Sequence, residues 1–379
     1  MDVDAFLRFH HSSRQALIEA ILEQVHRGPD DVLVLAGSLC EELGNHRSDV
    51  DIYRISADRF ALQGGDPVEI LDLGSFAADV ETICGADLDE LLARLGAVDS
   101  DGERDPRQAV ADFSDAEVKL LHQLRIAQPI TGTGAWQRLV GAIDRRKLGR
   151  VLLDRAVAWM GALHIDILGF IESGDDDSAR PLLRAFRWRL AAALLAGLGE
   201  TNPAEKWQTR QLAALRTVRA GTCLPGGLDL DRIYDAWLAL DRRIGDSAAE
   251  TAFRALLGLR FSIVPWAQHR FLAGYPLDSE NNIFPEVRRD GAGGGSVLPA
   301  LRLDSQIQRD ARGIWLSRVA SPEVIYINPL AHEVLLHFDG TATAGEAAQR
   351  LAQISPATSA EIATAIDDVH AMLGDRAFI

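Results

Sequence analysis

The sequence predicts an α+β protein with three folded parts: a small sheet-containing core, an α-helical bundle and a C-terminal winged-helix-like module. Three observations lead to this prediction. Strand patterns bounded by turn residues fill the start of the chain, whereas apolar residues recur at helical spacing from Ser114 to about Leu257. Near the C-terminus, two strand patterns precede three helical ones. A chain of 379 residues also exceeds one ordinary hydrophobic core, so two or three domains are expected.

The first part of the chain alternates helix and strand patterns. Apolar residues at helical spacing predict a helix from Ser13 to Val25, which the polar stretch HRGPDD ends. The continuous apolar run VLVLAGS predicts a buried strand that stops at a Gly-Ser turn. DVDIYRI and PVEILDL predict two further strands, and residues 75–98 are expected to form two short helices.

Turn-forming stretches divide the rest of the chain. Breaks at QPITGTG, ESGDDDSARP, GETNP and GTCLPGG predict about five helices in the helical region. GIWLSR and EVIYIN predict a later strand pair, with ALRLDS as a candidate first strand, and AHEVLLHF, AGEAAQRLAQ and SAEIATAIDDVHAML predict three helices. The expected domains are therefore residues 1–112, 113–275 and 300–379, with the Gly- and Pro-rich residues 276–299 as a linker.

Charge and composition exclude several classes of protein. Lys and Arg number 39 against 55 Asp and Glu, a net charge of −16, which repels nucleic acids and anionic membranes. Three distant cysteines exclude a disulfide scaffold and a cysteine-based zinc site, and they fit a reducing compartment. The N-terminus lacks a signal-peptide pattern and the longest apolar stretches are too short to span a bilayer, so a cytoplasmic location is expected.

The most informative stretch is LAGSLCEELGNHRSDVDIYRI. The first strand ends at Gly37 and Ser38, which offer a close backbone approach and a hydroxyl to a phosphate group. The next strand presents Asp49 and Asp51 on one face, because the two residues are two positions apart. Two carboxylates this close repel each other unless a cation lies between them, and Mg²⁺ prefers oxygen ligands. The stretch therefore predicts a site for Mg²⁺ and a phosphate-bearing substrate.

A third acid is expected from the strand PVEILDL. Glu69 is the first choice and Asp72 the second, since the two side chains point to opposite faces of a regular strand. Together with Asp49 and Asp51, the third acid would complete a cage for two metal ions. Gly-Ser is also a common turn, and Asp-x-Asp is common on solvated strands. Their combination at this spacing favours the functional interpretation.

Gly37-Ser38, nine further residues, Ser48-Asp49-Val50-Asp51 and then Glu69 resemble the signature of the DNA polymerase β-like nucleotidyltransferases, which include the aminoglycoside and minimal nucleotidyltransferases. The resemblance implies a mixed-sheet nucleotidyltransferase core and two Mg²⁺ ions. It also implies transfer of a nucleoside monophosphate from an NTP, with ATP as the expected donor, and release of pyrophosphate.

The resemblance assigns roles residue by residue. Asp49 and Asp51 would ligate both metal ions, and Glu69 would ligate the catalytic ion and orient or deprotonate the acceptor hydroxyl. The residues expected to bind the nucleotide are Gly37, Ser38, Ser48 and Lys206.

The stretches FSDAEVKLLHQLRIAQPITG and GETNPAEKW resemble the all-α half that follows the core in antibiotic-type nucleotidyltransferases. In the second stretch, Lys206 would contact the nucleotide by charge and Trp207 by stacking. The alternative is a solvated Lys206 and a core Trp207. Metal positioning and charge neutralisation make a separate general base optional, and Asp154, Asp166 and His46 stay open as candidates.

The C-terminal module has too little positive charge to read DNA. From Arg312 onward four Arg and no Lys stand against eight Asp and Glu, so a helix in a groove would lack phosphate anchors. EVIYIN could instead be an edge strand that accepts an extended peptide, beside the helix from Ser359 to Leu373. A winged-helix interaction or dimerisation domain is the alternative.

VIYINPLAHEVLLHFDGTATAGEAAQRLAQ is similar to the PqqD-like fold, also called the RiPP recognition element. The matching features include an apolar strand that ends in Asn328-Pro329 and a later Asp339-Gly340 turn. The resemblance implies binding of the leader region of a ribosomally made precursor peptide, between the third strand and the last helix. The residues expected to line this cleft are Val324, Tyr326 and Ile362.

The leading interpretation is a metal-dependent nucleotidyltransferase whose C-terminal module recruits a peptide bearing a hydroxyl acceptor. The first alternative is a small-molecule O-nucleotidyltransferase of the antibiotic-modifying type. The second is a non-catalytic peptide-binding scaffold, although the joint presence of Asp49, Asp51 and Glu69 favours an enzyme. The NTP preference, the acceptor, the choice between nucleotidyl and phosphoryl transfer and a possible homodimer stay open.

Overall fold

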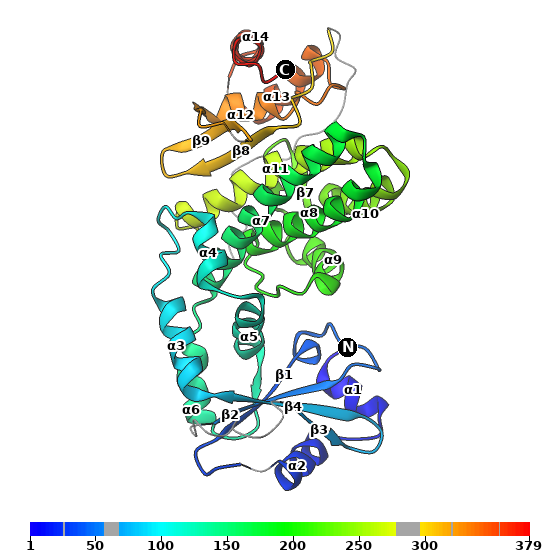
Figure 1. Ribbon diagram of the computed structural model, residues 1–379, viewed down its shortest axis with the longest axis vertical. Coiled ribbons are helices and arrows are strands. Elements are labelled where there is room, and N and C mark those ends of the chain that lie inside the picture. Colours follow the sequence, from blue (N-terminus) through cyan, green and yellow to red (C-terminus); the bar gives the residue numbers. More distant parts are fainter. Residues whose placement is uncertain (26, 57–67, 278–295, 320, 356) are drawn as a thin grey trace. The chain divides into compact units, whose positions relative to one another are not determined.

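The computed structural model confirms the α+β class with a mixed sheet, and its described residues form two compact units (Figure 1). The described residues are 1–25, 27–56, 68–277, 296–319, 321–355 and 357–379. Unit 1 comprises Met1–Val98, Ala111–Leu148 and Thr201–Trp207. Unit 2 comprises Asp99–Val110, Gly149–Glu200 and Gln208–Ile379. Unit 1 therefore takes in segments from the stretch 113–275 as well as the N-terminal residues.

Unit 1 is built on a sheet whose strand order, among the described residues, is β3-β4-β2-β1-β5 (Figure 1). Its strands are β1 (Val32–Ala36), β2 (Val50–Ser56), β3 (Val68–Asp72), β4 (Ala77–Cys84) and β5 (Gln128–Pro129). β2 and β4 are parallel, and the other neighbouring pairs are antiparallel. Because β2 and β4 are parallel, equivalent positions on the two strands lie side by side along the sheet.

The two faces of this sheet differ in polarity. α1 (Val3–Phe9) and α2 (Arg14–Gln24) cover one face, where their apolar side chains join those of alternate strand residues in the core. Strand residues of this core are Leu33, Leu35, Val50, Ile52, Leu71, Ala78 and Val80. The opposite face of β2 and β4 carries the intervening residues, Asp51, Tyr53, Asp79 and Glu81. The strand alternation thus places the carboxylates away from the α1–α2 core.

The strand β4 lies where the sequence predicted a helix, so the prediction of two helices over residues 75–98 is wrong in its first half. Ala78 and Val80 are buried whereas Glu81 is exposed, which is the period-two pattern of a strand. The second half is helical as expected, and α3 runs over Gly85–Gly96.

Helical elements complete unit 1. α5 (Asp115–Ile126) begins with a capping box, in which the backbone N–H of Glu117 donates to Ser114 Oγ and the Glu117 carboxylate accepts from the Ser114 N–H. The remaining elements that lie wholly in unit 1 are α6 (Thr133–Gly141) and the short 3₁₀ turns η1 (Ser38–Glu41) and η2 (Glu205–Trp207). Ser38 of the Gly-Ser turn is the first of the four residues of η1.

The helices of unit 2 pack against one another, with α11 in contact with α8 and α10. They are α7 (Arg145–Ser173, whose first residues belong to unit 1), α8 (Asp176–Gly197), α9 (Gln208–Val218), α10 (Leu230–Asp246) and α11 (Ala249–Leu272), and α4 (Pro106–Asp112) begins in this unit. More helices form than the expected five, because residues 142–144 separate α6 from α7 and residues 247–248 separate α10 from α11. No helix in the described ranges combines the length and apolar character needed to cross a bilayer.

The C-terminal module has the predicted order of strands followed by helices. Its elements are β8 (Ser305–Asp310), β9 (Gly313–Arg318), β10 (Val324–Ile327), α12 (Pro329–Leu335), α13 (Ala344–Ile354) and α14 (Ser359–Asp375). The strands are antiparallel in the order β10-β9-β8 within the described residues. The first strand begins at Ser305 rather than at Ala300, so the prediction of ALRLDS as this strand is wrong.

Buried polar contacts attach the module to the helices of unit 2. β8 packs against α11, and His332 Nε2 of α12 lies 2.9 Å from the carbonyl oxygen of Phe261. The Glu333 carboxylate accepts from the Gly226 N–H at 2.8 Å. Most of the predicted linker 276–299 lies outside the described residues.

Candidate active site

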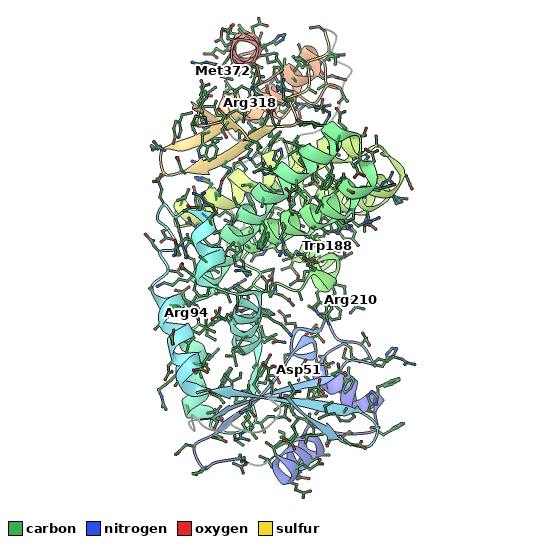
Figure 2. The ribbon with its side chains drawn as sticks, in the orientation of Figure 1. Asp51, Arg94, Trp188, Arg210, Arg318 and Met372 are labelled. Atoms are coloured by element: carbon green, nitrogen blue, oxygen red, sulfur yellow. The ribbon has the colours of Figure 1, made fainter. Side chains whose placement is uncertain are left out.

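The site begins where β1 ends. Gly37 has a φ of +79°, in the left-handed region that favours glycine. Antiparallel pairing places Ala36 opposite Asp51, and a Cβ atom on Gly37 would lie 1.7 Å from Asp51 Oδ2 (Asp51 is labelled in Figure 2). The Asp51 carboxylate therefore packs directly on the glycine backbone, in space that any other residue would fill.

The parallel pairing of β2 and β4 adds an acid that the sequence analysis missed. Asp79 stands opposite Asp51 in register, and adjacent strands lie about 5 Å apart. Burial raises the pKa of Asp51, and the neighbouring Asp49 and Asp79 carboxylates act in the same direction. Lys119 and Lys206 act in the opposite direction. Three carboxylates and two ammonium groups thus form one electrostatic cluster.

Glu69 does not join this cluster, and its assignment as the third acid is wrong. β3 pairs with β4 and not with β2, so β4 lies between Glu69 and the two aspartates. Glu69 is paired with Val80, a residue of the core under α1 and α2, and therefore lies on the opposite face of the sheet from Asp51. Asp72 shares the acidic face but is one strand further from β2 than Asp79 is.

A cavity of about 350 Å³, entirely within unit 1, is lined by Asp49 and Asp51 of the acidic cluster, whereas Asp79 is not among its lining residues. Its walls come from the stretch 37–51, from α5 and from the segment Thr201–Trp207. The structure brings six of the predicted residues to this cavity, namely Gly37, Ser38, Ser48, Asp49, Asp51 and Lys206.

Lysine and tryptophan side chains lie on the same walls. Lys206 Nζ is 5.1 Å from the centre of the Trp207 ring, a cation–π distance, and Trp207 is half-buried against the cavity rather than enclosed in the core. Lys119, on α5, is the second cation near Asp51. A single lysine on an amphipathic helix gives no sequence signal, so only the packing of α5 over the sheet reveals it.

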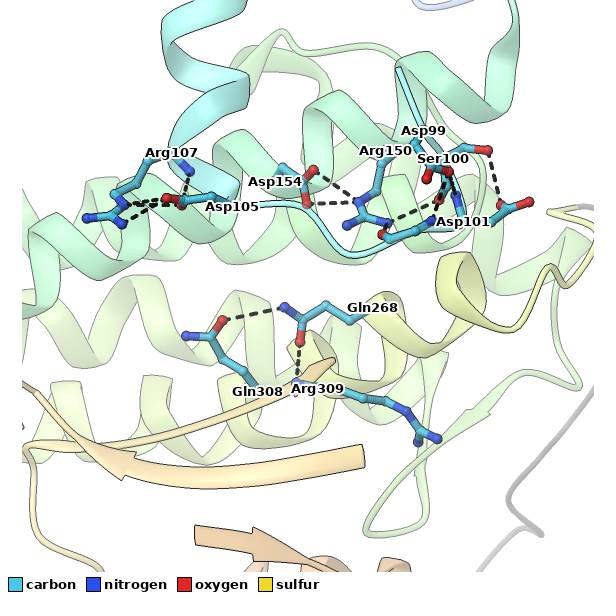
Figure 3. A network of polar contacts seen from close by, with 11 residues as sticks. Asp99, Ser100, Asp101, Asp105, Arg107, Arg150, Asp154, Gln268, Gln308 and Arg309 are labelled. Atoms are coloured by element: carbon cyan, nitrogen blue, oxygen red, sulfur yellow. Dashed lines mark hydrogen bonds and ion pairs between the residues drawn. The ribbon is translucent and has the colours of Figure 1, made fainter. Parts of the chain in front are cut away.

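The open candidates for a general base lie elsewhere. His46 is exposed, and its ring stacks on Phe9 with ring centres 5.0 Å apart. Asp154 is buried in unit 2, where both of its oxygens accept from Arg150 Nε at 3.0 Å (Figure 3). Arg150 also donates to two carbonyls of the loop before α4, so this ion pair fastens that loop to α7. Asp166 is exposed on the same helix.

The acidic cluster suits a hard cation. Within the described residues, no three His, Cys, Asp or Glu side chains are grouped so that they alone could hold a metal ion. The chemistry of the donors fits Mg²⁺, because Asp49, Asp51 and Asp79 present carboxylate oxygens, and because burial, together with the charges of Asp49 and Asp79, raises the pKa of Asp51.

The predicted peptide-binding residues do not share a surface. Val324 and Tyr326 are 44% and 39% exposed on β10, the outer strand of the described sheet. The Tyr326 hydroxyl donates to Asp310, and the Arg312 guanidinium lies 4.7 Å from the centre of the Tyr326 ring. Ile362 of α14 is fully buried, so the prediction that it lines an open cleft is wrong.

Comparison with known proteins finds a low structural similarity between this chain and a solved structure. No protein-family model matches the chain, and no curated protein matches its sequence. Among solved structures, the nucleotidyltransferase-like protein from Exiguobacterium sibiricum 255-15 is similar over 68% of this chain and 77% of that chain, with 13% identity and a TM-score of 0.38. The function of this chain is therefore inferred from the residues of the site itself.

Proposed function

We propose that unit 1 is a metal-dependent nucleotidyltransferase, which transfers a nucleoside monophosphate from an NTP to a hydroxyl group. The observation that carries the proposal is the position of the Gly-Ser turn against the acidic face of β2 and β4, in a cavity that also holds Lys206. A turn that presents backbone to phosphate, paired carboxylates and an ammonium group are the parts that phosphoryl chemistry requires.

The triphosphate would lie along the Gly37-Ser38 turn. Ser48 Oγ accepts from the Asn45 N–H at 2.8 Å, which leaves the Ser48 hydroxyl proton to donate to a phosphate oxygen. Lys119 and Lys206 would neutralise phosphate charge from two walls of the cavity, α5 and the segment Thr201–Trp207. The Trp207 ring offers a stacking surface for the nucleobase.

Asp49, Asp51 and Asp79 would hold Mg²⁺, which when bound neutralises the charge that develops on the phosphates. In the reaction, the acceptor oxygen forms a bond to the α-phosphorus while the bond from that phosphorus to the β-phosphate bridging oxygen breaks. The electron pair leaves with pyrophosphate, and the acceptor proton passes to a carboxylate of the cluster.

Calorimetric titration of each NTP with Mg²⁺ tests the proposal. We expect metal-dependent binding by the wild-type protein and its loss in the double variant Asp49→Asn/Asp51→Asn. Glu69→Gln is the matched control, since it removes a carboxylate of the same domain from the other face of the sheet. A well-folded wild-type protein that binds no NTP would contradict the proposed activity.

A peptide acceptor is the second part of the proposal. It is supported by β10, which among the described residues pairs only with β9 and presents Val324 and Tyr326 to solvent. An extended peptide could add to that edge. Incorporation of α-³²P-labelled NTP into synthetic Ser- and Thr-containing peptides, compared with aminoglycosides, separates this acceptor from the small-molecule alternative. A protein that binds these peptides but no NTP would be the scaffold instead.

A further inference from the structure

A chain of polar contacts along the wall of the cavity joins three separate segments of unit 1. His122 of α5 stands at its centre and is 2% exposed. His122 Nδ1 lies 3.0 Å from Thr201 Oγ1, and His122 Nε2 lies 3.1 Å from Glu41 Oε2 of η1. The same Glu41 oxygen accepts from Asn202 Nδ2 at 2.6 Å. The turn after β1, the helix α5 and the start of the segment Thr201–Trp207 are thereby connected.

One assignment of donors and acceptors accounts for both contacts of the Thr201 hydroxyl. Arg125 Nε donates to Thr201 Oγ1 at 2.8 Å, so the Thr201 hydroxyl proton is directed to His122 Nδ1. Nδ1 is then the acceptor, and Nε2 carries the ring proton and lies within ion-pair distance of the Glu41 carboxylate without the geometry of a hydrogen bond. The hydrogen bond that the Glu41 carboxylate accepts in this chain is the one from Asn202 Nδ2, and a bond to a charged acceptor is stronger than one between neutral groups.

The order carboxylate, imidazole, hydroxyl also occurs in nucleophilic triads, but Thr201 does not fit that role. Its side chain is fully buried, and its oxygen already accepts from Arg125. A nucleophile must reach the substrate, and this hydroxyl faces the interior. The chain is therefore a structural connection.

At both ends, this chain of contacts reaches segments that line the cavity of unit 1. Glu41 is the last residue of the turn η1 that begins at Ser38. Asn202 begins the segment that ends in Lys206 and Trp207, and its Oδ1 accepts from the Ala204 N–H at 2.9 Å, which shapes the turn between them. Glu41 and Asn202 thus link the phosphate-binding turn to the segment that carries the lysine and the tryptophan.

We propose that His122 is a positioning residue: through Glu41 and Asn202 it holds the segment Thr201–Trp207 against the Gly37-Ser38 turn and so sets the affinity for NTP. This inference rests on the proposed function. The carboxylates of Asp51 and Asp79 are positioned independently of His122, by the pairing of β2 with β4. Loss of His122 should therefore weaken nucleotide binding and leave the chemical step nearly unchanged.

The experiment compares His122→Ala and the milder, nearly isosteric Thr201→Val with the wild-type protein. We expect the Kd and KM for Mg²⁺-NTP to rise about 10-fold in His122→Ala, equal to about 1.4 kcal/mol, with kcat within about threefold of wild type. Thr201→Val should shift both constants in the same direction by less. Amide hydrogen exchange of the segment Thr201–Trp207 should accelerate in both variants without NTP, while that of β4 stays unchanged.

His332→Asn is the matched control, because His332 is equally buried, bonds the carbonyl oxygen of Phe261 and belongs to unit 2. It should lower stability without changing NTP affinity. The double variant Glu41→Ala/His122→Ala should be no weaker in NTP binding than the worse single variant, since the two residues act as one unit.

Three other results would contradict either the positioning role of His122 or the proposed function. Unchanged NTP affinity and unchanged exchange of Thr201–Trp207 in both variants would overturn the positioning role. A fall in kcat of about 100-fold at constant KM would also overturn it, because it would place His122 in the chemical step. If the wild-type protein binds no NTP, the proposed function fails, and hydrogen exchange alone still decides whether His122 holds the segment.

Discussion

Asp51 and Asp79 occupy the same register on two parallel strands and the same face of the sheet. Asp49, two residues before Asp51, adds a third carboxylate on that face, and Gly37 leaves no side chain above Asp51. The acidic cluster is therefore a product of strand pairing, and it depends on β4 as much as on the Asp-x-Asp motif.

Replacement of Asp79 tests this dependence. Asp79→Asn keeps the side-chain volume and removes one negative charge, so we expect kcat for pyrophosphate release to fall by about 100-fold or more, with the fold retained. Glu69→Gln should keep wild-type activity. Equal losses in the two variants, measured with the same NTP, would contradict the assignment of Asp79.

Gly37→Ala should be costly for two reasons. The left-handed φ of Gly37 strains any other residue, and the new Cβ would overlap the Asp51 carboxylate. We expect a loss of about 1–3 kcal/mol in the free energy of unfolding and loss of NTP binding. Urea denaturation and calorimetry measure the two effects. Gly134→Ala, in α6 of the same unit, meets no atom within 4 Å and should be tolerated.

Stability should depend on pH through Glu333. Burial raises the pKa of Glu333 from 4.5 to about 7, and its bond from the Gly226 N–H only partly opposes this. Since the folded-state pKa is the higher one, the stabilising contribution of the protonated carboxyl is complete below pH 4.5 and is lost as the pH rises to about 7. The loss is on the order of 3 kcal/mol.

Glu333→Gln isolates this effect, since the amide oxygen can still accept from Gly226 and does not titrate. Urea unfolding of both proteins at pH 5 and pH 7.5 should show a smaller decline in stability for the variant. The same decline in both proteins would assign the pH dependence to other groups.

The thiol of Cys40 should be unreactive in the folded protein. Burial raises its pKa to about 12, and the thiol donates to the carbonyls of Leu35 and Ala36 at 3.4 Å. Because the thiolate is the nucleophile, N-ethylmaleimide at pH 8 should leave Cys40 unmodified until urea is added. Peptide mass spectrometry reads the outcome, and rapid modification of Cys40 in native protein would contradict it.

Part of this site could be predicted because it is local. Gly37, Asp49 and Asp51 belong to two consecutive strands that pair with each other, so the period of a strand and one turn are enough to bring them together. To predict that Asp79 of β4 joins these acids, one would need the order of the strands in the sheet, and the sequence pattern does not contain that order. Ala77 and Ala78 favour a helix intrinsically, and pairing on both sides overrides that preference.

The other differences between the predicted and the observed site residues arise from tertiary packing. Lys119 is an ordinary helical lysine until α5 lies over the sheet, and no periodicity marks it. Ile362 lies on the predicted helix, but the apolar pattern that predicts the helix also predicts its buried face. To line a cleft, Ile362 would have to lie on the exposed side of that helix.

The division of unit 1 into three stretches of chain has a consequence for its synthesis. A ribosome releases the turn and the three aspartates within Met1–Val98, then α5, and the segment with Lys206 only after the long helices α7 and α8 have emerged. A nascent chain shorter than about 200 residues therefore carries the acids and Lys119 without Lys206, and no contiguous fragment contains the whole unit without α7 and α8. A chain that stopped after α5 would form an acidic sheet with one wall of its cavity missing.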